Sequence, residues 1–140
     1  MSDLRFIHCD WQQYREQLSF VRREVFIQEQ NVPEELEWDE FDRTAQHILV
    51  LNDTQPVATA RIKKDGHIGR MAVLKQYRQQ GIGSEILLRL LDDARKLELK
   101  KVFLYAQVSA IHFYEKQGFV CEGNEFMDAG IPHKMMIKKL

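Results

Sequence analysis

The chain has 140 residues with 20 basic and 21 acidic side chains, and its formal net charge at pH 7 is −1. This near-neutral balance argues against binding to nucleic acid through bulk electrostatics. No segment holds the roughly 20 consecutive apolar residues that a membrane-spanning helix needs, and we expect no membrane contact. The length fits a single domain, residues 1–140, with enough bulk for a core.

The charged N-terminus, MSDLRFIHCD, lacks the apolar core of a signal peptide. The two cysteines, Cys9 and Cys121, lie far apart and have no metal-ligand spacing. We therefore expect reduced, partly buried thiols in a cytoplasmic protein that uses no metal.

The first elements are a short strand at residues 4–8 and a helix that runs to about Ile27. Asp10, with Gln13 three residues later, is typical of a helix N-cap and its capping-box partner. Apolar residues at helical spacing predict the buried stripe of this helix: Tyr14, Leu18, Val21 and Val25.

Residues 28–45 form an acidic segment with seven carboxylates and two interleaved aromatic residues, Trp38 and Phe41. Two interpretations stay open. Runs of charge usually lie in solvated loops, although the aromatic side chains need a surface on which to pack. Alternatively, the segment forms one wall of a substrate cleft whose carboxylates attract a cationic amine.

Three apolar runs on short turns predict an antiparallel meander: residues 47–51, 57–63 and 67–74. A long amphipathic helix follows the meander. Its apolar residues fall on one broad face: Ile82, Ile86, Leu87, Leu90, Leu91 and Ala94.

The strand after this helix, residues 101–106, completes a strand-helix-strand crossover, which predicts a parallel strand pair. A short helix capped by Ser109 and ended by Gly118 comes next. Residues 119–122 and 134–139 would close the sheet as a hairpin. The expected fold class is α/β, an α+β mixed sheet that is mostly antiparallel, with a central parallel strand pair and flanking helices.

The turn before the long helix has the chemistry of an anion site. A strand, a glycine-bearing turn and a helix N-terminus supply free backbone N–H groups at the positive end of the helix dipole. A Walker loop and a dinucleotide fingerprint both fit badly, because Glu85 and Ile86 stand where those motifs need other residues. The pattern that fits is Arg-x-x-Gly-x-Gly: Arg78, Gln79, Gln80, Gly81, Ile82 and Gly83. A well-capped helix after a strand is the competing interpretation.

A second motif, Phe-Tyr-x-x-x-Gly-Phe, spans residues 113–119. Taken alone, it describes a helix that ends at a glycine between core aromatics. Together, the two motifs resemble the acetyl-CoA pyrophosphate signature and the following aromatic motif of the GCN5-related N-acetyltransferases, the GNAT superfamily. Residues 23–33 and 129–136 resemble the ElaA/YjcF-like branch. The resemblance covers nearly the whole chain and implies the GNAT fold.

The C-terminal segment, residues 129–136, is also similar to the ending of the glyphosate N-acetyltransferases. In that group the matching histidine is regarded as the catalytic base, which implies this role for His133. That group also uses an arginine in the strand before the CoA loop, matched here by Arg70. Its second substrate arginine is replaced by Gln107, so the resemblance does not imply a strongly anionic substrate.

The resemblance further implies that acetyl-CoA is the co-substrate. Strand residues Met71, Ala72 and Val73 would offer backbone groups to pantetheine. The loop would hold the pyrophosphate: Arg78, Gln79, Gln80, Gly81, Ile82, Gly83 and Ser84. The expected substrate-binding residues are Arg23, Arg70 and Gln107.

Acetyl transfer to an amine requires a base for the amine proton and a donor for the developing thiolate. Tyr114 is the expected acid, acting first as a hydrogen-bond donor, since a phenol (pKa about 10) is a weaker acid than a thiol (about 8.5). His133 is the expected base, because a neutral imidazole accepts a proton near physiological pH. Glu29 is the rival base, directly or through water, and His47 is expected to be structural.

We therefore expect an N-acetyltransferase that acts on the primary amine of a small molecule by direct attack in a ternary complex. Two alternatives stay open. The chain could acetylate a protein lysine or N-terminus, since residues 34–42 suit a basic peptide as well as a polyamine. It could also bind acyl-CoA without catalysis. The GNAT resemblance is compatible with a homodimer.

Overall fold

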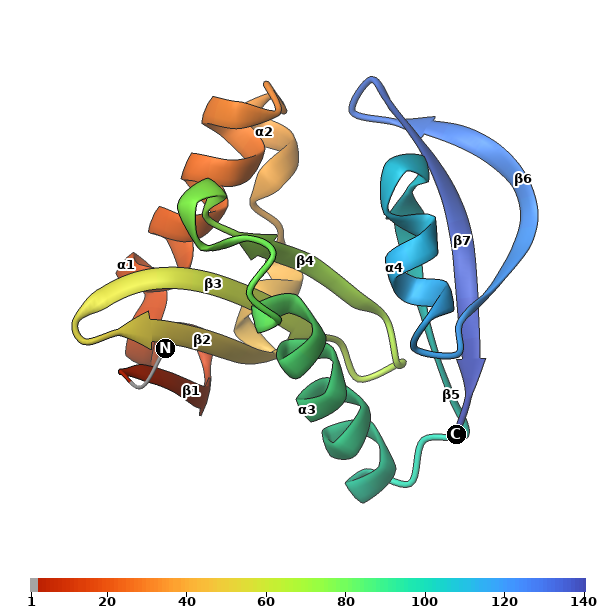
Figure 1. Cartoon of the computed structure of the whole chain (residues 1–140), viewed down its shortest axis with the longest axis horizontal. Helices are drawn as coiled ribbons and strands as arrows, with labels where there is room; N and C mark the ends of the chain where they lie inside the picture. Colours follow the sequence, from red (N-terminus) through yellow and green to blue (C-terminus); the bar gives the residue numbers. More distant parts are fainter. Residues whose placement is uncertain (1–2) are drawn as a thin grey trace.

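The computed structural model describes residues 3–140 and contains two antiparallel sheets with helices packed on them (Figure 1). Met1 and Ser2, which the single-domain prediction included, lie outside the described residues. The strands are Leu4–Cys9 (β1), Gln46–Asn52 (β2), Gln55–Ile62 (β3), Ile68–Val73 (β4), Lys101–Gln107 (β5), Val120–Asp128 (β6) and Ile131–Lys139 (β7). The first sheet has the order β1-β2-β3-β4, and the second has the order β5-β7-β6.

The α-helices are Trp11–Arg22 (α1), Glu34–Glu37 (α2), Ile82–Lys96 (α3) and Ile111–Glu115 (α4). Short 3-10 helices lie at Glu40–Arg43, Lys75–Tyr77 and Val108–Ala110. Helix α1 begins as predicted, since the Asp10 carboxylate accepts a hydrogen bond from Gln13 N at 2.9 Å. It ends at Arg22, before the predicted end near Ile27, and continues as a π-helix, Arg23–Glu29. The predicted stripe is buried except at Tyr14, where the backbone departs from helical geometry.

Both faces of the first sheet are buried, which explains the continuous apolar run in β2. Ile48 and Val50 pack in the cluster that contains α3, while Leu49 and Leu51 pack with Leu18 of α1. This division follows from the strand geometry, because successive side chains point to opposite faces.

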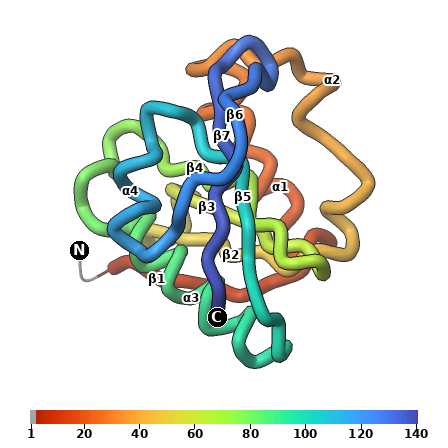
Figure 2. Tube along the Cα trace, turned by 90° about the vertical axis from the view of Figure 1, so that its right-hand side faces the viewer, coloured from red at the N-terminus to blue at the C-terminus, as the bar shows by residue number. Residues whose placement is uncertain are grey.

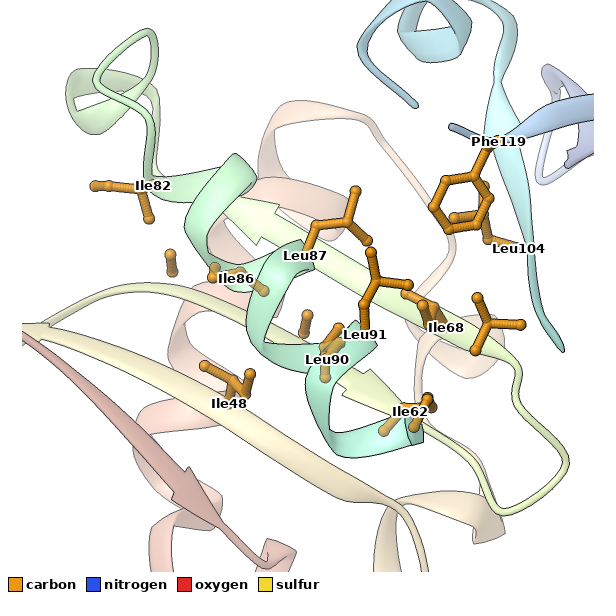
Figure 3. Close-up of a cluster of buried hydrophobic side chains, with 14 of the residues drawn as sticks. Ile48, Ile62, Ile68, Ile82, Ile86, Leu87, Leu90, Leu91, Leu104 and Phe119 are labelled. Atoms are coloured by element: carbon orange, nitrogen blue, oxygen red, sulfur yellow. The ribbon is translucent and has the colours of Figure 1, made fainter. Parts of the chain in front are cut away.

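Helix α3 buries the whole predicted face: Ile82, Ile86, Leu87, Leu90, Leu91 and Ala94. Figure 3 shows this face packed against the first sheet, with Leu104 of β5 and Phe119 alongside. One apolar core therefore spans both sheets and holds them together through α3.

The predicted parallel strand pair is wrong. His67, the residue before β4, makes one parallel bridge with Phe103 of β5, next to a hydrogen bond of 3.1 Å from Phe103 N to Gly66 O. Beyond this bridge the strands belong to separate sheets. The crossover through α3 exists, but it joins two sheets that part and does not build one continuous mixed sheet.

A bulge in β4 gives a physical reason for the parting. Ladder pairs join Thr59 to Ala72 and Arg61 to Gly69, so Arg70 and Met71 together lie opposite one residue of β3. Arg70 has a φ of 53°, in the left-handed region. A bulge bends its strand and interrupts the ladder, so β4 turns away from β5 at this point.

The C-terminal part contains one further correction. Ser109 does not cap the short helix: Ala110 occupies the N-cap position of α4, and no side chain among residues 3–140 caps its first turn. Gly118 ends this region with a φ of 92°, as predicted. The closing hairpin of β6 and β7 forms and is longer than predicted.

Strand β7 lies between β5 and β6 (Figure 2). Figures 1 and 2 both place the β6–β7 turn at the same end of the molecule as α2. Segments that are far apart in the sequence therefore meet at this end. Within residues 3–140, none of the helices has the length and apolar character needed to cross a membrane.

Candidate active site

A cleft of about 390 Å³ opens where β4 and β5 part. One side comes from β4, with Gly69, Arg70 and Met71. The other comes from β5 and α4, with Leu104, Tyr105, Gln107 and Tyr114. The mouth is completed by Phe26, Gln30, Val32, Leu36 and Glu37 on the segment that includes α2, and by Asp128, Ala129, Ile131 and His133 on the β6–β7 hairpin.

The cleft brings together five of the predicted site residues: Arg70, Met71, Gln107, Tyr114 and His133. The predicted pyrophosphate loop, residues 78–84, lies outside the cleft lining, at the N-terminus of α3. Arg23 and Glu29 also lie outside the lining.

The Tyr114 hydroxyl faces β4 across the cleft, where it donates a hydrogen bond to Met71 Sδ at 3.9 Å. Phe113 and Phe119 pack edge-on against the Tyr114 ring, with centroid distances of 5.0 and 5.9 Å. Burial raises the pKa of Tyr114 to about 12. The phenol therefore keeps its proton at neutral pH and can serve as a fixed donor to a sulfur atom.

The His133 ring is held in one tautomer. It is 8% exposed, and its Nδ1 lies 2.7 Å from the carbonyl oxygen of Ile131. A carbonyl oxygen only accepts, so Nδ1 is the donor, and Nε2 remains as the acceptor of the neutral ring. Phe126 stacks on the imidazole at a centroid distance of 5.9 Å. This geometry suits a proton acceptor.

The loop before α3 has the backbone of an anion site. Gln79 and Gly81 have positive φ angles of 62° and 83°. Gly81 is the N-cap of α3, and no side chain within the described chain bonds to the first turn there. The N–H groups of this turn and the positive end of the helix dipole are thus available to an anion. The Phe113 ring lies 3.5 Å from where a side chain on Gly83 would begin, so the two sequence motifs pack together.

Arg78 is engaged by the protein itself. Its guanidinium donates two hydrogen bonds to the Glu29 carboxylate, at 2.7 and 2.6 Å, and Nε donates to Val73 O at 2.9 Å. The hydrogen bonds from Arg78 lower the pKa of Glu29, which makes this carboxylate a weaker base. The pair ties the π-helix to the loop before α3.

The acidic segment lines one side of the cleft through Leu36 and Glu37, as one interpretation expected. Three of its carboxylates, however, pair with three arginines from other elements. The acidic members are Glu37, Asp39 and Asp42, and the basic members are Arg22, Arg61 and Arg70. We call these six residues the arginine network. Its formal charges cancel, so they are not available to attract a cationic substrate.

Arg22 is the centre of the arginine network and is 1% exposed. It donates to Glu37 Oε2 at 2.8 Å and to Asp42 Oδ1 at 2.7 Å. Its guanidinium also lies over the rings of Trp11 and Trp38, at 5.3 and 5.0 Å from their centroids. Arg22 also donates to Glu37 O at 3.0 Å, and burial of the cation is possible because two carboxylates, this carbonyl oxygen and two aromatic rings surround it.

The network reaches the cleft through Arg70. Its guanidinium donates to Glu37 O at 2.9 Å and to Asp39 Oδ2 at 3.3 Å. Arg61 holds the same Asp39 carboxylate with two hydrogen bonds of 2.7 Å. Burial alone would raise the pKa of Asp39, but the bonds and charge of Arg61, with Arg70, lower it to about 2.

His47 lies outside the cleft. It is 2% exposed, its Nε2 lies 2.9 Å from Asp42 O, and its ring lies 5.6 Å from that of Trp11. These contacts agree with the structural role expected for it.

Several residues that line the cleft were not predicted as site residues, among them Gln30 and Tyr105. Gln30, at the end of the π-helix, accepts a hydrogen bond from Gln107 Nε2 at 2.9 Å. Tyr105 lies on the same face of β5 as Gln107, while Leu104 and Ala106 are buried on the other face. The two-residue period of a strand could have placed Tyr105 beside Gln107. No comparable signal marks Gln30.

Comparison with known proteins identifies the family. Residues 10–140 match the model of the acetyltransferase (GNAT) domain. The chain belongs to the GNAT acetyltransferase family. It is 42% identical over 123 residues to the uncharacterized N-acetyltransferase YjcF of Bacillus subtilis, covering 85% of this chain and 88% of the relative.

Solved structures agree with this assignment. Escherichia coli ElaA has a TM-score of 0.82 and 29% identity to this chain, with 96% of this chain and 98% of ElaA covered. A GNAT acetyltransferase of Elizabethkingia anophelis with acetyl-CoA bound shares the fold, with a TM-score of 0.75, 14% identity and 100% of each chain covered. The predicted ElaA/YjcF-like branch is confirmed, and the protein is an acetyl-CoA-dependent N-acetyltransferase.

The arginine network predicts unequal costs for two neighbouring arginines. Arg22→Ala leaves Glu37 and Asp42 buried without their main partner, and breaking such a pair costs about 3–5 kcal/mol of unfolding free energy. Arg23→Ala removes an exposed pair with Glu34 and a contact with the Trp38 ring, and it should cost much less, because solvent screens an exposed pair. Urea unfolding followed by circular dichroism measures both variants. Equal losses would contradict the network.

Proposed function

We propose that this enzyme acetylates the primary amine of a small molecule by direct attack of the amine in a ternary complex. The observation that carries the proposal is the single cleft, between the parted strands, that both Tyr114 and His133 line. The reaction needs a group that accepts the amine proton and a donor that stabilises the developing thiolate. This cleft contains a fixed acceptor and a fixed donor.

Two backbone features fit the acetyl-CoA co-substrate, which supplies the acetyl thioester. Strand β4 is an edge strand of its sheet, so the backbone groups within Met71, Ala72 and Val73 that do not pair with β3 would be available to pantetheine. The uncapped first turn of α3, within residues 78–84, would bind the pyrophosphate. Arg78 would support this loop through its pair with Glu29.

Tyr114 would stabilise the leaving thiolate. With its pKa raised to about 12 by burial, the phenol is a much weaker acid than a thiol with an ordinary pKa of about 8.5. Full proton transfer to the thiolate is therefore uphill. A hydrogen bond is the role that this environment favours, and the contact with Met71 Sδ already points the hydroxyl towards a sulfur.

His133 would accept the amine proton at Nε2 as the new C–N bond forms and the C–S bond breaks. The tautomer fixed by Ile131 O supports this role, and so does the likeness of residues 129–136 to the ending of the glyphosate N-acetyltransferases. Glu29 is the weaker candidate, because Arg78 holds it outside the cleft lining. We propose that Glu29 acts by positioning Arg78.

The substrate-binding residues fall into different roles. Gln107 and Gln30 form an amide pair at the cleft and could orient an acceptor. Arg70 would shape the wall, since its donors bond to Glu37 and Asp39. Arg23 bonds to Glu34 instead of facing the cleft, so we assign it no contact with the acceptor.

The role of Tyr114 is tested by Tyr114→Phe. Removing a positioned donor from a developing charge should lower kcat roughly a hundredfold. Because the pKa of Tyr114 is about 12, its hydroxyl is protonated throughout the assay range, and the shape of the pH–rate profile should stay unchanged. Stopped assays with an amine that the enzyme acetylates measure kcat and the pH–rate profile. Tyr14→Phe on α1 is the control, and a Tyr114→Phe variant with wild-type kcat would rule out the assignment.

The role of His133 is tested by His133→Ala, which should abolish the acidic limb of the kcat/KM profile because the proton acceptor is lost. His112→Ala, at a histidine whose side chain is 81% exposed on α4, is the matched control and should keep the limb. Survival of the limb in His133→Ala would show that another group is the base. Loss of the acidic limb in Glu29→Gln, with the limb kept in His133→Ala, would identify Glu29 as the base.

A further inference from the structure

One wall of the cleft consists of aromatic rings in contact with one another. Tyr105 packs edge-on against His67, with centroids 4.8 Å apart, and against Phe126, at 5.6 Å. Phe126 in turn stacks on His133. The rings come from β5, β6 and β7, which lie side by side in Figure 2, and from the residue before β4. We call Tyr105 and Phe126, with the two imidazoles, the ring wall.

The ring wall is open to solvent beside the proposed base. Tyr105 is 44% exposed and Phe126 is 37% exposed, although both are large apolar rings. The cleft is lined by three of these rings: Tyr105, His67 and His133. Phe126 lies outside the lining and stacks on the His133 ring. A molecule whose amine reaches His133 would therefore lie along Tyr105.

The opposite side of the cleft mouth is also apolar. Phe26, Val32 and Leu36 line it, and Leu36 is 55% exposed. An acceptor body in this cleft would thus have aliphatic side chains on one side and rings on the other. This lining suits a flat apolar group.

The charges of the cleft argue against a polyamine. Glu37 and Asp128 are the carboxylates that line it, and Glu37 is occupied by Arg22 and Arg70. Asp128 is exposed, so solvent screens its attraction for a cation. A polyamine needs several carboxylates along its length, and of the seven in the acidic segment only Glu37, which is paired with two arginines, lines the cleft.

The cleft also carries little free positive charge to repel a single ammonium group. Burial, with the charge of Lys63, lowers the pKa of His67 to about 4, so this ring is neutral at neutral pH. Arg70 is paired with Glu37 and Asp39. A neutral ring wall attracts a cation through its π faces.

From the ring wall beside His133, we propose that the acceptor is an arylalkylamine whose aromatic body lies on Tyr105, while Phe126 holds the Tyr105 and His133 rings in place. The inference rests on the proposed function, because it places the amine of a small molecule at His133. Tyr105 is then a specificity-determining residue and Phe126 a positioning residue, and truncating Tyr105 should change the choice of acceptor without changing the use of acetyl-CoA.

The test compares phenethylamine with cyclohexylethylamine at saturating acetyl-CoA, with thiol release as the readout. The two amines share a carbon skeleton and differ in the aromatic ring. We expect wild-type kcat/KM to favour phenethylamine by about fivefold, as expected for a ring contact. Tyr105→Ala should remove this preference, chiefly through KM for the amine, and leave KM for acetyl-CoA unchanged. Phe126→Ala should reduce the preference less, because Phe126 supports the Tyr105 ring from outside the cleft lining.

Three controls separate a specific contact from a loss of fold. Tyr105→Phe keeps the ring and should keep the preference. Phe20→Ala removes an aromatic ring on α1 that is 40% exposed, and this variant should also retain the preference for phenethylamine. Melting temperatures of all variants show whether they are folded, and isothermal titration of phenethylamine into the CoA complex measures amine binding independently of turnover.

The outcomes separate the inference from the proposed function. Equal use of the two amines, a preference for putrescine or spermidine, or an unchanged preference in Tyr105→Ala would overturn the inference while small-amine acetylation stands. Acetylation of a peptide panel with no turnover of any small amine would overturn both.

Discussion

The parting of β4 from β5 is the constraint on which the rest of the structure depends. After the single bridge between His67 and Phe103, the two strands belong to different sheets. A continuous ladder would have filled the space that the cleft now occupies. The separation is tolerated because α3 packs against both sheets, so apolar burial supplies the cohesion that backbone pairing does not. The bulge at Arg70 turns β4 at the point where the strands part.

The arginine network stabilises the wall that faces this opening. It joins α1, β3 and β4 to the acidic segment, and its formal charges cancel. The most acidic part of the sequence therefore presents Leu36 and paired carboxylates to the cleft instead of a free negative surface. Amine chemistry in this cleft would depend on Tyr114, His133 and aromatic contacts more than on long-range attraction.

Much of this architecture was predictable where one local pattern determines the outcome. The stripe of α3, the glycine turn before it and the meander follow from periodicity and turn chemistry, and two short motifs placed Tyr114 and the anion loop. The resemblance of residues 129–136 to the glyphosate N-acetyltransferases pointed to His133, which lines the cleft and whose role stays a prediction. The predictions that failed depended on contacts between residues that are far apart in the sequence. The crossover through α3 correctly predicted that β4 and β5 are neighbours. It could not predict the bulge in β4, beside which the two strands separate. Helical spacing cannot show that Arg22 is buried, since its partners Glu37 and Asp42 lie in another segment. The π-helix that positions Gln30 has no sequence signal of its own.

Amide hydrogen exchange with and without saturating acetyl-CoA tests most directly whether acetyl transfer takes place in the cleft between β4 and β5. If it does, exchange should slow in β4 around the bulge, at residues 70–73, and in the loop at residues 78–84, because bound pantetheine and pyrophosphate would engage those backbone groups. Strand β2, already paired on both sides, should exchange unchanged and serves as the internal reference. Protection that leaves β4 and this loop unaffected would contradict the assignment of the cleft as the acetyl-transfer site.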